Sequence, residues 1–268
     1  MIRIPEIALA PQLLERLAGY QGEIDRVAAF DEKVATAKAA FSAANVKGNV
    51  AFDAIKIQLD RMCSGARRCM YCEDSAADEV EHFKPKTFYP ELTFLWENYL
   101  YACGPCNIAK REKFAVRAAS GEIKHLERKP KETPVAPPVG ESIAVNPRSE
   151  DPLEFIILDI AGDTFVFAPL PDAPERDAER AFYTVDLLKL NRDVLVRARR
   201  EAFKNLKLRL QEYIAIRDAG APHVELSAIV TSLVRMQHPS VWREMCRQRR
   251  SISLLNVLFE RAPEALGW

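Results

Sequence analysis

The sequence predicts a mainly helical α+β protein with one compact, cysteine-rich segment and one β-hairpin. Over residues 1–62, apolar side chains recur at steps of three and four, which indicates two or three helices with a break at Lys47-Gly48-Asn49. Over residues 63–116, cysteines, aromatics and short β-branched runs replace this spacing. Helical spacing returns beyond residue 175. Helices are therefore expected at both ends of the chain and short strands between them.

A proline-rich connector is predicted over residues 117–153. Between Lys129 and Pro152 it holds Pro130, Pro134, Pro137, Pro138, Pro147 and Pro152. Proline fixes φ and has no backbone N–H, so this density argues against regular structure. We expect an extended segment that runs over the surface.

Residues 154–268 are predicted to form a β-hairpin followed by helices. In "LEFIILDIAGDTFVFAPL" two apolar runs flank Ala161-Gly162-Asp163, a pattern typical of a hairpin. A long helical stretch follows, with a break near Asn191 and an end at Gly220 and Pro222. The stretches "ELSAIVTSLVRMQ" and "SVWREMCRQRRSISLLNVLFERA" predict further helices.

The charge balance gives no global attraction to nucleic acid. Lys plus Arg and Asp plus Glu each number 38 in 268 residues, so the formal net charge is zero. Binding to a polyanion would need local basic patches or a partner. The first residues lack the apolar run of a signal sequence, and no segment approaches 18 uncharged apolar residues. We therefore expect a cytoplasmic protein without a membrane anchor.

Four of the six cysteines form two C-x-x-C pairs, Cys69 with Cys72 and Cys103 with Cys106. In a reducing compartment such pairs indicate metal ligands before disulfides. Two pairs together predict a tetrahedral zinc site, which would stabilise this segment by roughly 10 kcal/mol or more. A redox dithiol and four unligated thiols are the alternatives. Cys63 and Cys246 are expected to be buried thiols.

Polar residues suited to catalysis lie between the two cysteine pairs. Glu81 and His82 are adjacent in "DEVEHFKPK", and Pro85 closes any strand that runs through them. Neighbours in a strand point to opposite faces, so both residues can serve one site only if the backbone bends. Asn98 follows in "WENYLYA", and Asn107 lies in the first turn of a predicted helix that starts at the last cysteine pair.

The order C-x-x-C, acidic-His-x-x-Pro, Asn, C-x-x-C-N-x-x-K resembles the HNH endonuclease motif and its zinc-stapled ββα-metal core. The resemblance covers Cys69 to about Phe114. "CMYCE", "EVEHFKPKTFYPEL", "WENYLYACGPCNIAKREKF", "NPRSEDPLEF" and "AFYTVDLLKLNRDVLVRARR", spread over roughly residues 50–210, further resemble the HNH nucleases of retron-associated and Septu-type antiphage systems. That resemblance implies a nuclease subunit that works with an ABC-type ATPase.

The resemblance also implies a role for each polar residue. Glu81 and Asn107 are expected to bind a catalytic divalent ion, His82 to act as general base, and Asn98 to orient the loop that carries the base. Many HNH sites begin with Asp-His or His-His, and this chain has Glu81-His82. Asp78 and Glu79 are close enough in sequence to compete for the ligand role, and adjacency to His82 favours Glu81.

General chemistry agrees with this division of roles. A histidine with an unperturbed pKa near 6.5 can accept a proton from water at neutral pH, and such a base contributes about 10²–10⁴ in rate. Carboxylate and amide oxygens favour Mg²⁺ or Mn²⁺ over a second zinc ion. The family resemblance implies products with 5′-phosphate and 3′-hydroxyl ends.

Three basic clusters flank the predicted site and could contact phosphate. They are Arg67 with Arg68, Lys84 with Lys86, and Lys110 with Arg111 and Lys113. The sequence thus predicts a metal-dependent HNH endonuclease that cleaves DNA. Two alternatives stay open: a zinc-stabilised module that binds nucleic acid or a partner without cleavage, and a nuclease directed at RNA.

Overall fold

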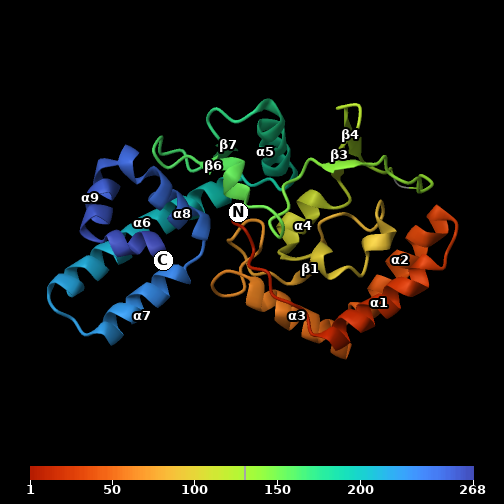
Figure 1. Ribbon diagram of the computed structural model, residues 1–268, viewed down its shortest axis with the longest axis horizontal. Coiled ribbons are helices and arrows are strands. Elements are labelled where there is room, and N and C mark those ends of the chain that lie inside the picture. Colours follow the sequence, from red (N-terminus) through yellow and green to blue (C-terminus); the bar gives the residue numbers. More distant parts are fainter. Residues whose placement is uncertain (130) are drawn as a thin grey trace.

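The computed structural model describes residues 1–129 and 131–268 and shows an α+β fold with small antiparallel sheets. In Figure 1 the cysteine-rich segment around β1 (Glu79–His82) and α4 (Gly104–Lys110) occupies the centre. The N-terminal helices lie below it and to its right, and the C-terminal helices lie to its left. The predicted fold class is confirmed at this level of mixed helices and short sheets.

Three helices form the N-terminal region, as the apolar spacing predicts. They are α1 (Pro11–Asp25), α2 (Phe30–Ala44) and α3 (Val50–Met62). Asn49, in the predicted break, caps α3 by accepting hydrogen bonds from the backbone N–H groups of Ala51 at 3.1 Å and Phe52 at 3.3 Å. Helix α3 packs against β2 (Tyr99–Ala102), which joins the N-terminal helices to the centre of the molecule.

The centre of the fold is an antiparallel hairpin followed by a short helix. Strands β1 and β2 pair with Glu81 opposite Leu100 and His82 opposite Tyr99, and α4 begins two residues after β2. The aromatic side chains of this segment are buried, as predicted: Phe83, Trp96, Tyr99 and Tyr101. Short 3-10 turns at Pro90–Leu92 and Trp96–Asn98 lie in the long connection between the two strands.

The predicted connector contains more regular structure than expected. Strands β3 (Phe114–Ala118), β4 (Ile123–Leu126) and β5 (Gly140–Ser142) form an antiparallel sheet in the order β4-β3-β5. The prolines do not prevent this, because Pro134, Pro137 and Pro138 precede β5 and leave its pairing groups free. Residues 132–138 are extended without helix or strand, while Pro130 lies outside the described residues.

The hairpin and helices predicted for the C-terminal part are present. Strand β6 (Ile156–Leu158) pairs with β7 (Phe167–Pro169), and α5 (Glu175–Leu187) packs on β7. The break near Asn191 separates α5 from α6 (Asp193–Asp218), and the Asn191 side chain bonds both backbone groups of Phe167 at 2.8 Å. The remaining helices are α7 (His223–Val234), α8 (Pro239–Gln248) and α9 (Ser253–Arg261), with 3-10 turns at Pro152–Glu154, Arg249–Ser251 and Pro263–Gly267.

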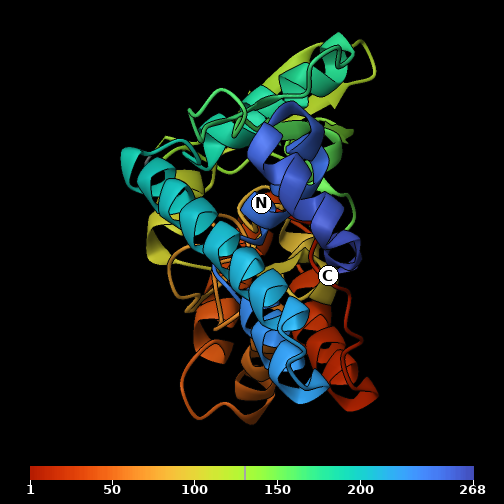
Figure 2. The ribbon, with the colours of Figure 1, turned by 90° about the vertical axis from the view of Figure 1, so that its left-hand side faces the viewer.

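The C-terminal helices pack together and contact the first cysteine pair. Figure 2 shows the long helix α6, against which α7, α8 and α9 pack. At the start of α8, the Ser240 hydroxyl donates to Glu73 at 2.5 Å, and His238 Nε2 lies 3.2 Å from an Asp74 carboxylate oxygen. Glu73 and Asp74 directly follow Cys72, so these contacts fix the turn that carries the first cysteine pair. Among the described residues, no helix has the length and apolar character that crossing a bilayer requires.

Arg199 is the largest fully buried side chain in the described structure, and we expect its replacement to destabilise the C-terminal region. Its guanidinium donates to the carbonyl oxygens of Phe165 at 3.2 Å and Leu190 at 2.5 Å, and burial lowers its pKa to about 10. Arg199→Met leaves both buried carbonyls without this donor, which should lower the free energy of unfolding by about 1–3 kcal/mol for each carbonyl. Urea unfolding measures this loss, and equal stabilities of Arg199→Met and the exposed-site control Arg197→Met would contradict it.

Candidate functional site

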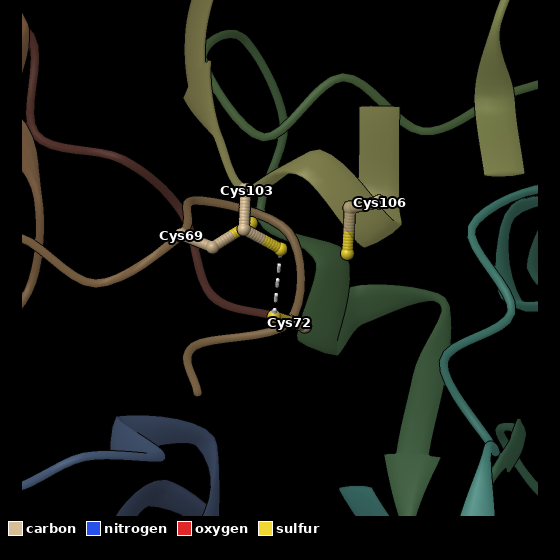
Figure 3. A group of neighbouring side chains, drawn as sticks. All are labelled: Cys69, Cys72, Cys103 and Cys106. Atoms are coloured by element: carbon tan, nitrogen blue, oxygen red, sulfur yellow. Dashed lines mark hydrogen bonds between the residues drawn. The ribbon is translucent and has the colours of Figure 1, made fainter. Parts of the chain in front are cut away.

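The four predicted cysteines converge on one point. Figure 3 shows Cys69 and Cys72 approaching from one chain segment and Cys103 and Cys106 from another. All four side chains are buried, and their sulfur atoms lie within 4.8 Å of one another. Tetrahedral Zn–S bonds of about 2.3 Å place sulfurs about 3.8 Å apart. The Cys72 and Cys103 sulfurs are 3.8 Å apart, which matches this spacing, and all four sulfurs are close enough together to hold one metal ion.

Backbone hydrogen bonds hold the two cysteine turns in place. The backbone N–H of Glu73 donates to the carbonyl of Cys69 at 2.9 Å, and that of Cys106 donates to the carbonyl of Cys103 at 3.1 Å. The guanidinium nitrogens of Arg192 lie 3.8 and 3.9 Å from the Cys106 sulfur. A guanidinium stabilises the negative charge that four thiolates around Zn²⁺ carry. Arg192 therefore belongs to the surroundings of the cluster, although it is 86 residues from Cys106 in sequence.

Beside the cluster, a cleft of about 670 Å³ opens between β1, α4 and the N-terminal helices. Several residues predicted from the sequence line it together: Glu81, His82, Lys86, Asn107 and Arg111. Glu79, which the sequence offers as a competing ligand, lines it as well. Asp78, the other competing ligand, is also in the lining, as is Glu112. The structure thus brings one imidazole, four carboxylates and the amides of Asn45 and Asn107 into one cleft.

His82 is held in one orientation at the end of β1. Its Nε2 lies 2.8 Å from the carbonyl oxygen of Thr93, and its ring centroid is 4.4 Å from that of Phe41 and 5.3 Å from that of Tyr99. A carbonyl oxygen can only accept, so Nε2 carries the proton and Nδ1 has a free lone pair. Burial lowers the pKa of His82 well below its usual value, which favours the neutral imidazole.

Asn98 does not line the cleft but fixes the loop next to His82. Its side-chain oxygen accepts from the backbone N–H of Lys84 at 2.8 Å, and its nitrogen donates to the carbonyls of Lys84 and Leu92 at 3.0 Å. These three bonds tie together the two ends of the loop after β1. Because Thr93 follows Leu92, the same bonds position the carbonyl group that His82 contacts.

Glu79 and Glu81 both face α4 but have different partners. Successive side chains of a strand alternate between faces, so residues 79 and 81 share one face of β1. Glu81 forms an ion pair with Lys110 at 2.6 Å, and Lys110 also donates to the carbonyl of His82 at 2.8 Å. Burial raises the pKa of Glu81, and the Lys110 charge opposes that rise. The Asn107 side chain instead donates to Glu79.

The sequence-based ranking of the metal ligands stays a prediction. Adjacency to His82 favours Glu81 as the carboxylate that binds the ion with Asn107. The structure places the competing carboxylate of Glu79 against Asn107 and pairs Glu81 with Lys110. Because side chains alternate between the two faces of a strand, the sequence alone could have shown that Glu79 and Glu81 share one face of β1. The pairing of Glu81 with Lys110 depends on how α4 docks on β1, which no local pattern specifies.

The predicted phosphate contacts fall into two groups. Lys86 and Arg111 line the cleft. The prediction that Lys110 contacts phosphate requires correction, because its side chain is 1% exposed and is bound to Glu81 and to the His82 carbonyl. The other four do not line the cleft: Arg67 is exposed, Arg68 donates to the Asp74 carbonyl at 2.6 Å, Lys84 lies 5.2 Å from the Tyr89 ring, and Lys113 lines a separate hollow.

The N-terminal helices form one wall of the cleft, which the sequence did not predict. Phe41 of α2 contacts the His82 ring, and the Lys86 ammonium lies 4.9 Å from the centre of the Phe41 ring. Lys38 of α2 forms an ion pair at 3.3 Å with Glu112, which follows α4. About 40 residues separate α2 from His82, and the apolar spacing of α2 indicates only a buried helix face.

One relative gives a partial match to this chain. Over 58 residues the chain is 43% identical to the Septu protein PtuB of Bacillus thuringiensis. This stretch is 20% of the present chain and 22% of PtuB, so the chain spans about a fifth of that relative's length. No protein-family model and no solved structure matches the chain. The chain therefore shares partial homology with a Septu protein.

Proposed function

We propose that the protein is a metal-dependent HNH endonuclease that hydrolyses DNA phosphodiester bonds in a Septu-type antiphage defence system. One observation carries the proposal: an oriented imidazole and a carboxylate–amide pair share the cleft beside a four-cysteine cluster. They lie on β1 and α4 in the order that the HNH resemblance implies. The partial homology to PtuB supports the defence role.

The chemistry follows from the groups in the cleft. His82 Nδ1 can accept a proton from the water that attacks the phosphorus atom. Asn98 keeps the imidazole in place through the loop that bears Thr93. The bond from phosphorus to the 3′-oxygen breaks, and the leaving oxygen takes a proton from a solvent water. The proton held by His82 then returns to solvent, which leaves the 5′-phosphate and 3′-hydroxyl ends of HNH cleavage.

The oxygen atoms near α4 fit a hard divalent ion. Asn107 and Glu79 are in contact and line the cleft, and Glu81 lies on the same strand face. Carboxylate and amide oxygens are the ligands that Mg²⁺ and Mn²⁺ prefer. We propose that Asn107 holds such an ion together with Glu81 or Glu79. A divalent ion at this place supplies positive charge against the charge that develops on the phosphate.

We also propose an ABC-type ATPase as the partner that brings the nuclease to DNA. The chain has equal numbers of acidic and basic residues, so its global charge does not draw it to DNA. A partner that binds DNA removes the need for such attraction. The proposal follows from the resemblance to Septu-type nucleases, and co-purification of the two proteins tests it.

Plasmid cleavage tests the catalytic role of His82. We expect wild-type protein with Mg²⁺ or Mn²⁺ to nick or linearise supercoiled DNA, and His82→Ala to lower the rate by about 10²–10⁴ because the base is lost. His125→Ala is the matched control, since His125 is exposed on β4 and does not line the cleft. Each preparation is first shown to hold one zinc ion per chain.

The other outcomes separate the competing functions. Equal cleavage by wild type and His82→Ala would place the active site elsewhere. No cleavage by any variant, with the ATPase present or absent, would favour a zinc-stabilised binding module. Parallel assays on single-stranded DNA, duplex DNA and tRNA separate a DNA nuclease from an RNA nuclease.

A further inference from the structure

We propose that α2 and α3 form a phosphate-binding wall of the cleft, with Lys56 as the main contact and Asn45 as a second donor. The inference rests on the proposed function and deepens it. It assigns to the N-terminal helices the recognition of the phosphodiester backbone next to the cleaved bond. The helices would then be part of the substrate site and would not serve only as a support for the hairpin.

Lys56 is the first observation. It lies on α3, is half-buried, and lines the same cleft as His82 and Glu79. Lys38 and Lys110, on either side of this cleft, each bind a carboxylate within 4.0 Å. In the described part of the chain, Lys56 has no such ion pair. A phosphate in the cleft would supply the counter-charge that Lys56 has not found among these residues.

Asn45 is the second observation and is independent of the first. It follows the last residue of α2, and its side chain lines the cleft. Its Oδ1 is buried and has no hydrogen-bond partner within the described residues. A buried polar atom beside a cleft needs a partner, which a ligand or an ordered water in the cleft would supply. The two ends of an asparagine amide can exchange places, and the amide N–H groups donate to phosphate oxygens.

The wall is fixed relative to the general base. Phe41 of α2 packs edge-on against His82, with ring centroids 4.4 Å apart. The Lys86 ammonium also contacts Phe41 and lies 4.9 Å from the centre of its ring. A nucleic-acid strand that contacts Lys56 therefore lies in the same cleft as His82. The carboxylates of the cleft lie on the other side, on β1 and after α4, where a divalent ion would offset their charge.

This distribution of charge indicates which part of the substrate the wall contacts. Cations and amides that contact phosphate position a nucleic acid without reading its sequence. Loss of one such contact weakens binding by a similar factor for every sequence. It also lowers the slope of log affinity against log salt by about 1.

The experiment measures binding of a fluorescein-labelled duplex oligonucleotide to the full-length chain at several KCl concentrations, with Ca²⁺ in place of Mg²⁺. The variants are Lys56→Gln, Lys56→Arg and Asn45→Ala, and the matched control is Lys47→Gln. Lys47 is exposed between α2 and α3 and does not line the cleft. Thermal unfolding and zinc content show that each variant is folded.

We expect Lys56→Gln to raise Kd about tenfold near 0.1 M salt and to lower the salt slope by about 1. Lys56→Arg keeps the charge and should stay within about twofold of wild type, as should Lys47→Gln. In cleavage assays, Lys56→Gln should raise KM more than it lowers kcat. Asn45→Ala should weaken binding with little change in the salt slope, because it removes no charge.

The results distinguish this inference from the proposed function. If folded Lys56→Gln keeps the wild-type Kd and salt slope while His82→Ala loses cleavage, phosphate binding by α2 and α3 is disproved and the proposed nuclease activity is supported. If the wild type binds DNA in a Lys56-dependent way but never cleaves it, phosphate binding by these helices is supported and the proposed nuclease activity is disproved. Absence of any DNA binding by the wild type also disproves phosphate binding by α2 and α3.

Discussion

Replacement of Cys103 by serine is expected to abolish zinc binding and to unfold the β1-β2-α4 unit. The four buried sulfurs lie close enough together to hold one metal ion, and the site joins two segments about 30 residues apart. Zinc binding to such sites is worth about 10–16 kcal/mol, as much as the whole stability of a typical domain. The loss of one ligand should therefore destabilise the fold as well as the cleft.

Metal analysis and thermal unfolding measure this effect. We expect one zinc ion per wild-type chain, almost no zinc in Cys103→Ser, and a much lower unfolding temperature for the variant. Cys63→Ser is the matched control, because Cys63 lies outside the cluster and burial raises the pKa of its thiol to about 12. A Cys103→Ser protein with wild-type zinc content and unfolding temperature would rule out this role.

Local patterns predicted much of the site. The C-x-x-C spacing identifies all four cysteines, because two residues between ligands suffice to close a turn around an ion. His82 stands out through its neighbours Glu81 and Pro85, and the structure places it in the cleft. Apolar periodicity predicts α1, α2 and α3, because each buries one helix face against the rest of the protein.

Features that depend on tertiary contacts could not be predicted in the same way. The position of α2 over His82 depends on packing between Phe41 and residues that are distant in sequence. The sheet β4-β3-β5 depends on pairing across the proline-rich segment, where local propensity argues against strands. Acidic and basic residues alternate along the sequence around Arg199, and no local pattern marks it as buried, yet it donates to the carbonyls of Phe165 and Leu190 inside the protein.

The ion pair between Lys110 and Glu81 gives the second large expected effect. Lys110→Met should destabilise the protein by about 3–5 kcal/mol, because it leaves a buried carboxylate without its counter-charge. The Glu81 and Lys110 side chains are 8% and 1% exposed, so water cannot replace the lost partner. The substitution also removes the donor to the His82 carbonyl, so any cleavage activity should fall with stability.

A double-mutant cycle separates the ion pair from the other contacts of Lys110. Glu81→Gln removes the charge but keeps the shape of the side chain, so Glu81→Gln/Lys110→Met should cost less than the sum of the two single changes. Lys113→Met is the matched control, since Lys113 is exposed three residues further on, and we expect a change within about 0.5 kcal/mol. Urea unfolding measures the free energy of unfolding of the wild type and the four variants. Strict additivity would mean that Lys110 stabilises the fold through the His82 carbonyl and packing alone, and that Glu81 is free to bind a metal ion without first losing a partner.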